Sequence, residues 1–155
     1  MLAHDEAVEF IRPGLGEILK IYLKLMDEID FEDLVTALKN IVEIYGDEIN
    51  PYALSLCMKL SEAYVRLVQA KTNNEDEDAD TGLTADGLMS AIRRVLNSIS
   101  GKFPDLYPQL EGVLDKALYT TLSVEGMSSV DEGLTCIAEL IYNQNTVSET
   151  MWRFY

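Results

Sequence analysis

The sequence predicts an all-α fold in which about three helical hairpins stack as an α-solenoid. Strand signals are almost absent, because β-branched residues are scattered at helical spacing and no hairpin dipeptide separates alternating runs. An apolar residue, one intervening residue and a proline occur together three times, at Pro13, Pro51 and Pro108. Each occurrence is followed by two stretches with a helical apolar pattern. Three copies of one helix pair are the simplest explanation of this recurrence.

The first predicted hairpin spans residues 13–46. Pro13 is expected in the first turn of its first helix, where the missing backbone N–H costs nothing. The second helix carries an apolar quartet at offsets 0, 3, 4 and 7, which places its members on one face: Leu34, Ala37, Leu38 and Ile41. Gly46 and, in the next copy, Gly101 stand where second helices should end in a left-handed residue.

The second predicted hairpin spans residues 50–100 and contains an acidic insertion at 72–82. Its first helix has the apolar stripe Ala53, Leu56, Leu60, Ala63, Tyr64 and Leu67, and its second has the quartet Leu88, Ala91, Ile92 and Val95. From the marker proline to the quartet, the three copies measure 21, 37 and 26 residues. The 16 residues by which the middle copy exceeds the first fall on the insertion. We therefore expect it in the turn within this hairpin.

The third predicted hairpin spans residues 103–143, with the quartet Leu134, Ile137, Ala138 and Ile141 in its second helix. Ser129 to Glu132 and Thr146 to Glu149 have the spacing of capping boxes, and the second of these predicts the start of a further repeat over 146–155. The final residues MWRFY end inside that starting helix, which leads us to expect an excised piece of a longer chain.

The repeating unit of roughly 40 residues is typical of HEAT and armadillo repeats. Residues 1–155 are accordingly interpreted as a single HEAT-repeat segment. The alternative is an up-and-down helical bundle, which also uses amphipathic helices and short loops. Bundles rarely repeat their proline and apolar offsets unit by unit, so the pattern favours the solenoid.

The composition limits the partners and the cellular compartment that we expect for this chain. A net charge of −15 disfavours nucleic acid and membrane surfaces as partners and favours basic proteins. No apolar run approaches the ~18 residues that span a bilayer. Cys57 and Cys136 each sit in a helical apolar pattern, where a thiol is usually a small buried hydrophobe, and a reducing cytosol or nucleus fits best.

The sequence predicts no enzyme, cofactor or metal site. His4 is the one histidine, and neither a Gly-rich phosphate loop nor Glu-x-x-His occurs. Asp76, Asp78 and Asp80 have the spacing that opens an EF-hand calcium loop, but Thr81 and Gly87 replace its required glycine and closing glutamate. The basic pair Arg93-Arg94 indicates ion pairing along an inner ridge of the solenoid, because the surrounding charge opposes a nucleic-acid patch.

The acidic residues concentrate in the three turns within hairpins, 27–33, 72–82 and 123–132. These turns carry five, five and three carboxylates and no Lys or Arg. In a stacked hairpin solenoid, turns of one kind lie along one edge. The predicted acidic edge, a candidate site for basic protein cargo, comprises Asp27, Glu28, Asp30, Glu32, Asp33, Glu75, Asp76, Glu77, Asp78, Asp80, Glu125, Asp131 and Glu132.

Other roles for these acids stay open. Asp30, Asp33 and Glu132 stand at predicted helix starts, where a negative charge is favourable by ~0.3–1 kcal/mol. A charge run is also commonly a solvated loop, and the composition of 73–80 is typical of disorder. Beyond solubility, an acidic edge steers Lys/Arg-rich partners with salt-sensitive affinity.

Several runs resemble the importin-β (karyopherin-β) superfamily, with the nearest likeness to the branch of importins seven and eight and their fungal relatives. They are DLVTALKNIVEIYGDEINPYALSLC (33–57), RLVQ (66–69) before the acidic insert, AIRRVL (91–96), DEGL (131–134) and MW (151–152). The order of the first run, the insert and AIRRVL is the most specific part of this likeness. It covers most of the chain.

The resemblance implies a HEAT-repeat piece of a nuclear transport receptor, from the C-terminal half of a longer protein. It implies basic cargoes such as ribosomal proteins and histones, nucleoporin contacts at the nuclear pore, release by Ran-GTP, and residence in cytoplasm and nucleus. The repeats that dominate Ran binding have no counterpart here, so no Ran-binding residue is assigned. The competing hypothesis is a HEAT scaffold subunit of a multiprotein complex, in which the acidic insert is a spacer.

Overall fold

The computed structural model describes residues 8–25, 31–46, 48–73 and 79–154 and is all-α over those ranges. Its helices are α2 (Leu15–Leu25), α3 (Phe31–Tyr45), α4 (Ala53–Asn73), α5 (Ala79–Ile99), α6 (Tyr107–Thr121) and α7 (Val130–Gln144). Short 3-10 turns accompany them: η1 (Arg12–Gly14), η2 (Asn50–Tyr52), η3 (Pro104–Leu106), η4 (Met127–Ser129) and η5 (Met151–Phe154).

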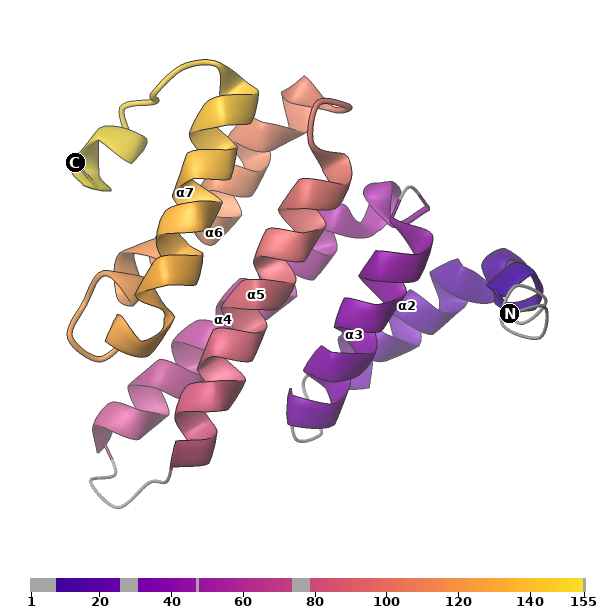
Figure 1. Cartoon of the computed structure of the whole chain (residues 1–155), viewed down its shortest axis with the longest axis horizontal. Coiled ribbons are helices and arrows are strands. Elements are labelled where there is room, and N and C mark those ends of the chain that lie inside the picture. Colours follow the sequence, from indigo (N-terminus) through magenta and orange to yellow (C-terminus); the bar gives the residue numbers. More distant parts are fainter. Residues whose placement is uncertain (1–7, 26–30, 47, 74–78, 155) are drawn as a thin grey trace.

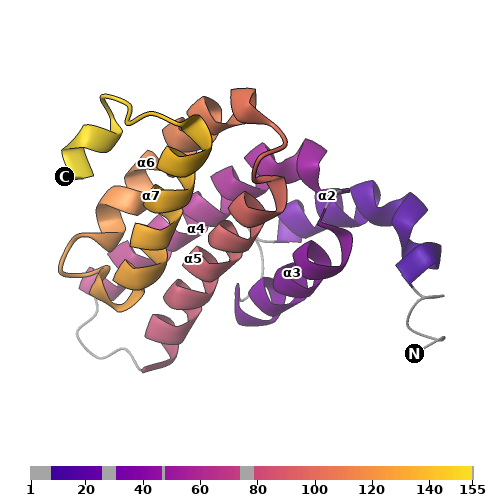
Figure 2. The same cartoon turned by 45° about the horizontal axis from the view of Figure 1, so that its top comes forward.

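The helices form two layers. Helix α4 packs against α6 in one layer, and α5 packs against both α3 and α7 in the other. Between the layers α4 packs against α5 and α6 against α7, while α2 lies beside α3 (Figures 1 and 2). Successive helix pairs therefore stack in chain order, which confirms the predicted all-α, HEAT-like solenoid segment and excludes the up-and-down bundle.

The prolines open the first helix of each pair. Pro13 lies in η1 directly before α2, Pro51 lies in η2 directly before α4, and Pro108 is in the first turn of α6. Because the first N–H groups of a helix have no intrahelical acceptor, proline costs no hydrogen bond there. The third copy has another proline, Pro104, in η3.

The helix ends match the sequence expectation only in part. Gly101 has φ +71 after α5, as predicted, whereas Gly46 after α3 is not left-handed. There the N–H groups of Glu48 and Ile49 both donate to the Tyr45 carbonyl, at 2.8 and 3.3 Å, so the helix end is satisfied without a left-handed residue. The left-handed residue that closes α7 is Asn145, with φ 56.

The apolar quartets differ in burial. All four members of the middle quartet on α5 are fully buried: Leu88, Ala91, Ile92 and Val95. On α7, Ile137 is buried but Leu134 is 51% exposed, and on α3 Leu38 is buried whereas Ala37 is exposed. Helix α5 has a neighbouring helix of its own layer on each side, whereas α7 has only α5. The predicted quartets therefore face the core completely only in the central hairpin.

The two predicted capping boxes do not form. Ser129 is the N-cap residue of α7 but makes no side-chain cap hydrogen bond, and Glu132 instead pairs with Arg93 of α5. After α7 the capping hydroxyl comes from Ser148, which accepts the Met151 N–H at 3.0 Å at the start of η5. Before α7 a contact with a neighbouring helix engages the glutamate of the box, and before η5 a different local hydroxyl provides the cap.

The connection between α6 and α7 requires close packing. A Cβ at Gly133 of α7 would clash with the Thr121 side chain of α6, so the glycine permits the two helices to approach.

Within the described ranges no helix is long and apolar enough to cross a membrane.

The burial difference between the quartets predicts unequal stability effects. Leu88→Ala removes a fully buried side chain and should lower the free energy of unfolding by about 2–5 kcal/mol. Leu134→Ala, at the matching position of α7, should cost less than about 1 kcal/mol, because the side chain is half exposed. Urea denaturation measures both, and equal costs would show that the central hairpin is not the core of the stack.

Candidate functional site

The turns within hairpins are flanked by helix ends that share one side of the molecule. The C-terminal ends of α4 and α6 and the N-terminal ends of α3, α5 and α7 all lie toward the lower side of Figure 1. The turns between hairpins, around η2 and η3, lie toward the upper side. The helix directions therefore place the ends that carry the predicted acidic edge on a common side.

The structure describes only part of the predicted acidic edge. Glu32 and Asp33 lie in the first turn of α3, and Asp80 lies in the first turn of α5, with side chains outside the described part. Seven further candidates lie outside the described residues: Asp27, Glu28, Asp30, Glu75, Asp76, Glu77 and Asp78.

Glu125 and Asp131 of the predicted edge are exposed, in the α6–α7 turn and the first turn of α7. The neighbouring Ser123 side chain and a backbone hydrogen bond lower the pKa of the Glu125 carboxyl. A lowered pKa keeps Glu125 charged from neutral into mildly acidic pH. Both side chains are thus available to an incoming cation.

Glu132, in contrast, is engaged within the protein. Its Oε2 lies 2.7 Å from the Arg93 Nε of α5, and the two side chains are 20% and 35% exposed, respectively. The neighbouring Arg94 reaches the other way, to α3, where its Nη1 donates to Glu43 Oε2 at 3.0 Å. The predicted ion pairing of Arg93-Arg94 is therefore observed, and it links α5 to both neighbours in its layer.

Sequence reasoning did not identify Glu43 as the partner of Arg94. The two residues are 51 positions apart, and only the stacking of α3 on α5 brings them together. The signal that could have identified Glu43 is that it and Arg94 lie on the second helices of successive hairpins, which stack against each other.

Two surface grooves follow the stacking of the layers. One, of about 440 Å³ between α4 and α6, is lined by Met58, Ser61, Glu62, Val65, Arg66, Gln69, Val113 and Lys116. The other, of about 370 Å³ between α3 and α5, is lined by Val42, Glu43, Gly46, Arg94, Asn97, Ser98 and Lys102. The second groove therefore contains the Glu43–Arg94 ion pair.

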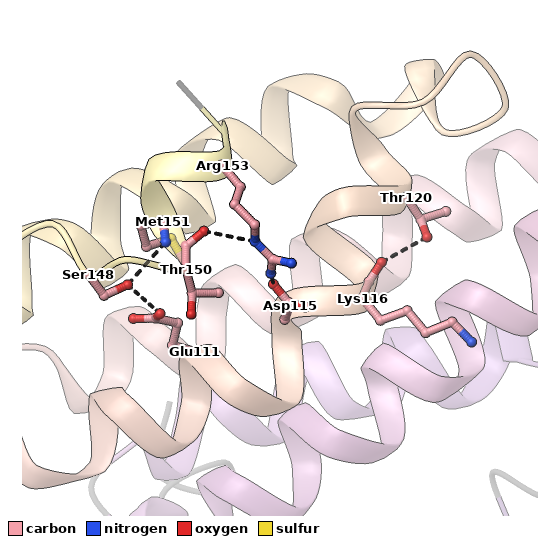
Figure 3. A network of polar contacts seen from close by, with 8 residues as sticks. All are labelled: Glu111, Asp115, Lys116, Thr120, Ser148, Thr150, Met151 and Arg153. Carbon is pink, nitrogen blue, oxygen red and sulfur yellow. Dashed lines mark hydrogen bonds and ion pairs between the residues drawn. The ribbon is translucent and has the colours of Figure 1, made fainter.

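A polar network binds the segment after α7 to α6 (Figure 3). Glu111 of α6 is buried, at 6% exposure, and accepts hydrogen bonds from the Ser148 hydroxyl and from Gln144 Nε2, the latter at 2.7 Å. One turn along α6, Asp115 pairs with Arg153 of η5. Two carboxylates thus hold the residues that follow α7.

On the edge opposite the turns within hairpins, Asn143 of α7 connects the third hairpin to the end of the second. Its side-chain oxygen accepts the Gly101 N–H at 2.9 Å and the Ser100 hydroxyl at 3.0 Å, just beyond α5. This contact and the Glu111 network are structural, because each satisfies polar groups near helix ends.

The described residues contain no group of three or more His, Cys, Asp or Glu side chains that could hold a metal ion. Gly87, at the position that would close a calcium loop, lies inside α5. The stretch that would open the loop begins at Asp76 and Asp78, outside the described part of the chain.

The two thiols are buried. Cys57 and Cys136 are fully inaccessible, and burial, reinforced for Cys136 by the Glu132 carboxylate, raises the pKa of the Cys136 thiol to about 12. Burial likewise raises the pKa of the Cys57 thiol far above its ordinary value. Neither thiol can supply a thiolate near neutral pH, in agreement with the structural role predicted for both.

Comparison with known proteins identifies relatives over nearly the whole chain. An importin beta-like SAD2 homolog of Arabidopsis thaliana is 38% identical over 146 residues, which is 94% of this chain and 14% of that protein. A probable importin-7 homolog of Dictyostelium discoideum is 30% identical over 154 residues, or 97% of the chain and 14% of that protein. Importin-8 of Danio rerio is 24% identical over 158 residues, with 96% and 14% coverage.

The chain thus spans about a seventh of the length of the curated relatives it matches. No protein-family model matches the chain. No solved structure matches it at a significant level.

The buried thiols predict slow chemical labelling. A thiol-specific disulfide reagent at pH 7.5 should label neither Cys57 nor Cys136 in the folded chain and should label both in denaturant. The check is the absorbance of the released thiol. Rapid labelling of the native protein would contradict the packing of α4 and α7.

The two ion pairs predict different coupling energies. Double-mutant cycles with Gln substitutions should give Arg93–Glu132 a coupling of about 1 kcal/mol and the more exposed Arg94–Glu43 about 0.2–0.5 kcal/mol, both decreasing with salt. Thermal or urea denaturation at low and high salt measures these energies. A larger coupling for Arg94–Glu43 would reverse the order that exposure predicts.

Proposed function

This chain belongs to the importin-β family, and we propose that it forms part of a nuclear transport receptor that binds basic protein cargo. The relationship over 94% of the chain, at 38% identity, to an importin beta-like protein is the observation that carries this proposal. The two-layer stack of helical hairpins supports it, because such a stack presents extended surfaces to partners.

The charge of the chain supports basic cargo. A net charge of −15 repels phosphate backbones and attracts Lys/Arg-rich proteins, of which ribosomal proteins and histones are the cargoes we propose. The acids of the turns within hairpins make the first contact. Among the described residues, Glu125 and Asp131 are the exposed members of the acidic edge, and the insertion at 72–82 contributes five more carboxylates.

Regulation belongs to the longer protein. We propose that the full receptor meets Ran-GTP and nucleoporins and moves between cytoplasm and nucleus through the pore. The present chain supplies a cargo surface, and none of its residues is assigned to Ran. A pull-down from cell extract tests this class: recovery of basic cargo and nucleoporins supports a receptor, whereas recovery of one fixed multi-subunit complex supports a scaffold.

Neutralising the insertion should weaken cargo binding. We expect Glu75→Gln, Asp76→Asn, Glu77→Gln, Asp78→Asn and Asp80→Asn together to reduce affinity for a basic histone-tail peptide at least tenfold, a loss of ~1.4 kcal/mol. The reason is the loss of five attractive charges. Fluorescence anisotropy at two salt concentrations measures the dissociation constants.

A matched pair of smaller variants separates position from total charge. Asp76→Asn with Asp78→Asn should weaken binding more than Asp105→Asn with Glu149→Gln, although each pair removes two charges. Asp105 precedes α6 in the turn between hairpins, on the opposite edge. Equal effects of the two pairs would show that only net charge matters and would remove the insertion as a contact.

A further inference from the structure

The end of α6 and the turn that leads to α7 expose a group of apolar side chains. They are Tyr119 (65% exposed), Leu122 (39%), Val124 (81%) and Met127 (63%), and we call these four residues the turn patch. Tyr119 and Leu122 are three positions apart, as are Val124 and Met127. Single apolar residues scattered over a surface need no explanation, whereas a group of them within one short segment indicates a surface that a partner covers.

The backbone of this turn is held in place by hydrogen bonds and packing. The Ser123 hydroxyl donates to the Thr120 carbonyl at 2.8 Å, and the Ser129 N–H donates to the Gly126 carbonyl at 3.0 Å. A Cβ at Gly126 would overlap the backbone of α6, so the turn lies directly against that helix. Ser129 is fully buried, and η4 packs against α5. Because the turn is already formed in the free chain, a partner pays little entropy to order it.

The charges around the turn patch are negative. Glu125 lies within the turn and Asp131 follows in the first turn of α7, and both are exposed. The sequence contains no Lys or Arg over residues 117–152. Of the nearest cations, Lys116 lines the groove between α4 and α6, and Arg93 of α5 is already in an ion pair with α7. The turn therefore combines an apolar surface with carboxylates that attract a basic partner.

We propose that the turn patch, bordered by Glu125 and Asp131, is a docking surface for a segment of a basic protein that carries apolar side chains among its lysines or arginines. The inference rests on the proposed function and deepens it, because it states what a basic partner must offer at this turn. The partner's apolar side chains cover the patch, and its cations pair with the two carboxylates. A segment with basic and polar residues alone leaves the patch in water and binds more weakly.

A second copy of this chain is a poor occupant of the surface. Each copy carries a net charge of −15, and two copies meeting at this turn would bring Glu125 and Asp131 against the same carboxylates. The turn also lies at an edge of the stack (Figure 1). Hairpins stack through their helix faces, which leaves such an edge open. Charge and position thus favour a basic partner over self-association.

Two synthetic peptides of equal length and equal lysine content test the apolar part of the surface. Leucines separate the lysines in one peptide, and serine replaces every leucine in the other. Each carries a fluorophore and is titrated into the 155-residue chain at physiological salt, so that anisotropy gives the dissociation constants. The leucine peptide should bind at least about fivefold more tightly, because only its side chains remove the turn patch from water.

A double variant locates the effect. Val124→Thr with Met127→Gln makes the patch polar with little change in size, and should weaken leucine-peptide binding at least about threefold while leaving serine-peptide binding unchanged. The matched control, Ile21→Thr with Met58→Gln, removes two exposed apolar side chains from α2 and α4 and should change neither affinity. Both double variants keep the net charge, and circular dichroism verifies that their helices persist.

A second double variant tests the carboxylates. Glu125→Gln with Asp131→Asn should weaken the binding of both peptides at least about threefold, because each peptide uses its lysines there. It should also reduce the salt dependence of leucine-peptide binding. Unchanged affinities of this variant would overturn the docking surface.

The remaining outcomes separate this inference from the proposed function. Equal affinities of the two peptides for the wild-type chain overturn the docking surface and leave the proposed function standing. The same conclusion follows when the patch variant binds the leucine peptide as tightly as wild type, or when the control variant loses as much affinity as the patch variant. Absence of binding by both peptides overturns both proposals.

Discussion

The packing of α5 is the constraint on which the rest of the structure depends. This helix contacts α4 in the other layer and both α3 and α7 in its own, and its quartet Leu88, Ala91, Ile92 and Val95 is fully buried. Burying a side chain such as Leu, Ile or Val stabilises the fold by about 1.5–3 kcal/mol. The central hairpin can therefore hold its two neighbours in place. Because the apolar faces provide this stability, the charged residues are not needed in the core and can lie in the turns and in ion pairs between helices.

The separation of buried apolar faces from charged surface residues explains how a chain with a net charge of −15 folds as a compact stack. The chain has only 12 Lys and Arg residues. Several of them connect one helix to another through ion pairs, as Arg93, Arg94 and Arg153 do. Carboxylates greatly outnumber them, and 13 of the 27 Asp and Glu residues fall in the sequence ranges 27–33, 72–82 and 123–132. Self-repulsion is weakest when like charges are solvated and spread along an edge. We propose that this arrangement offers a long anionic surface to a basic partner.

The sequence was sufficient to predict the elements that depend on local chemistry and regular spacing. The proline-marked helix starts, the buried stripe from Ala53 to Tyr64, the central quartet and the ion pairing of Arg93-Arg94 are all observed. It failed where a tertiary contact outcompetes a local one. Glu132 pairs with Arg93 of α5 instead of completing its capping box, and Leu134 is 51% exposed because no helix of the described residues covers that face of α7. Before η5 the failure is local, since Ser148 rather than Thr146 provides the cap. For the candidate site, a count of charges located the acidic turns, but only the stacking of α3 on α5 could bring Glu43 to Arg94.

The central claim is that basic partners bind along the side formed by the turns within hairpins. Its most direct test is a titration of the isotope-labelled chain with a basic peptide, followed by amide chemical-shift changes in the assigned NMR spectrum. We expect the largest changes at the first turns of α3, α5 and α7 and near Glu125 and Asp131. Changes concentrated instead around η2 and η3, on the opposite edge, would contradict it.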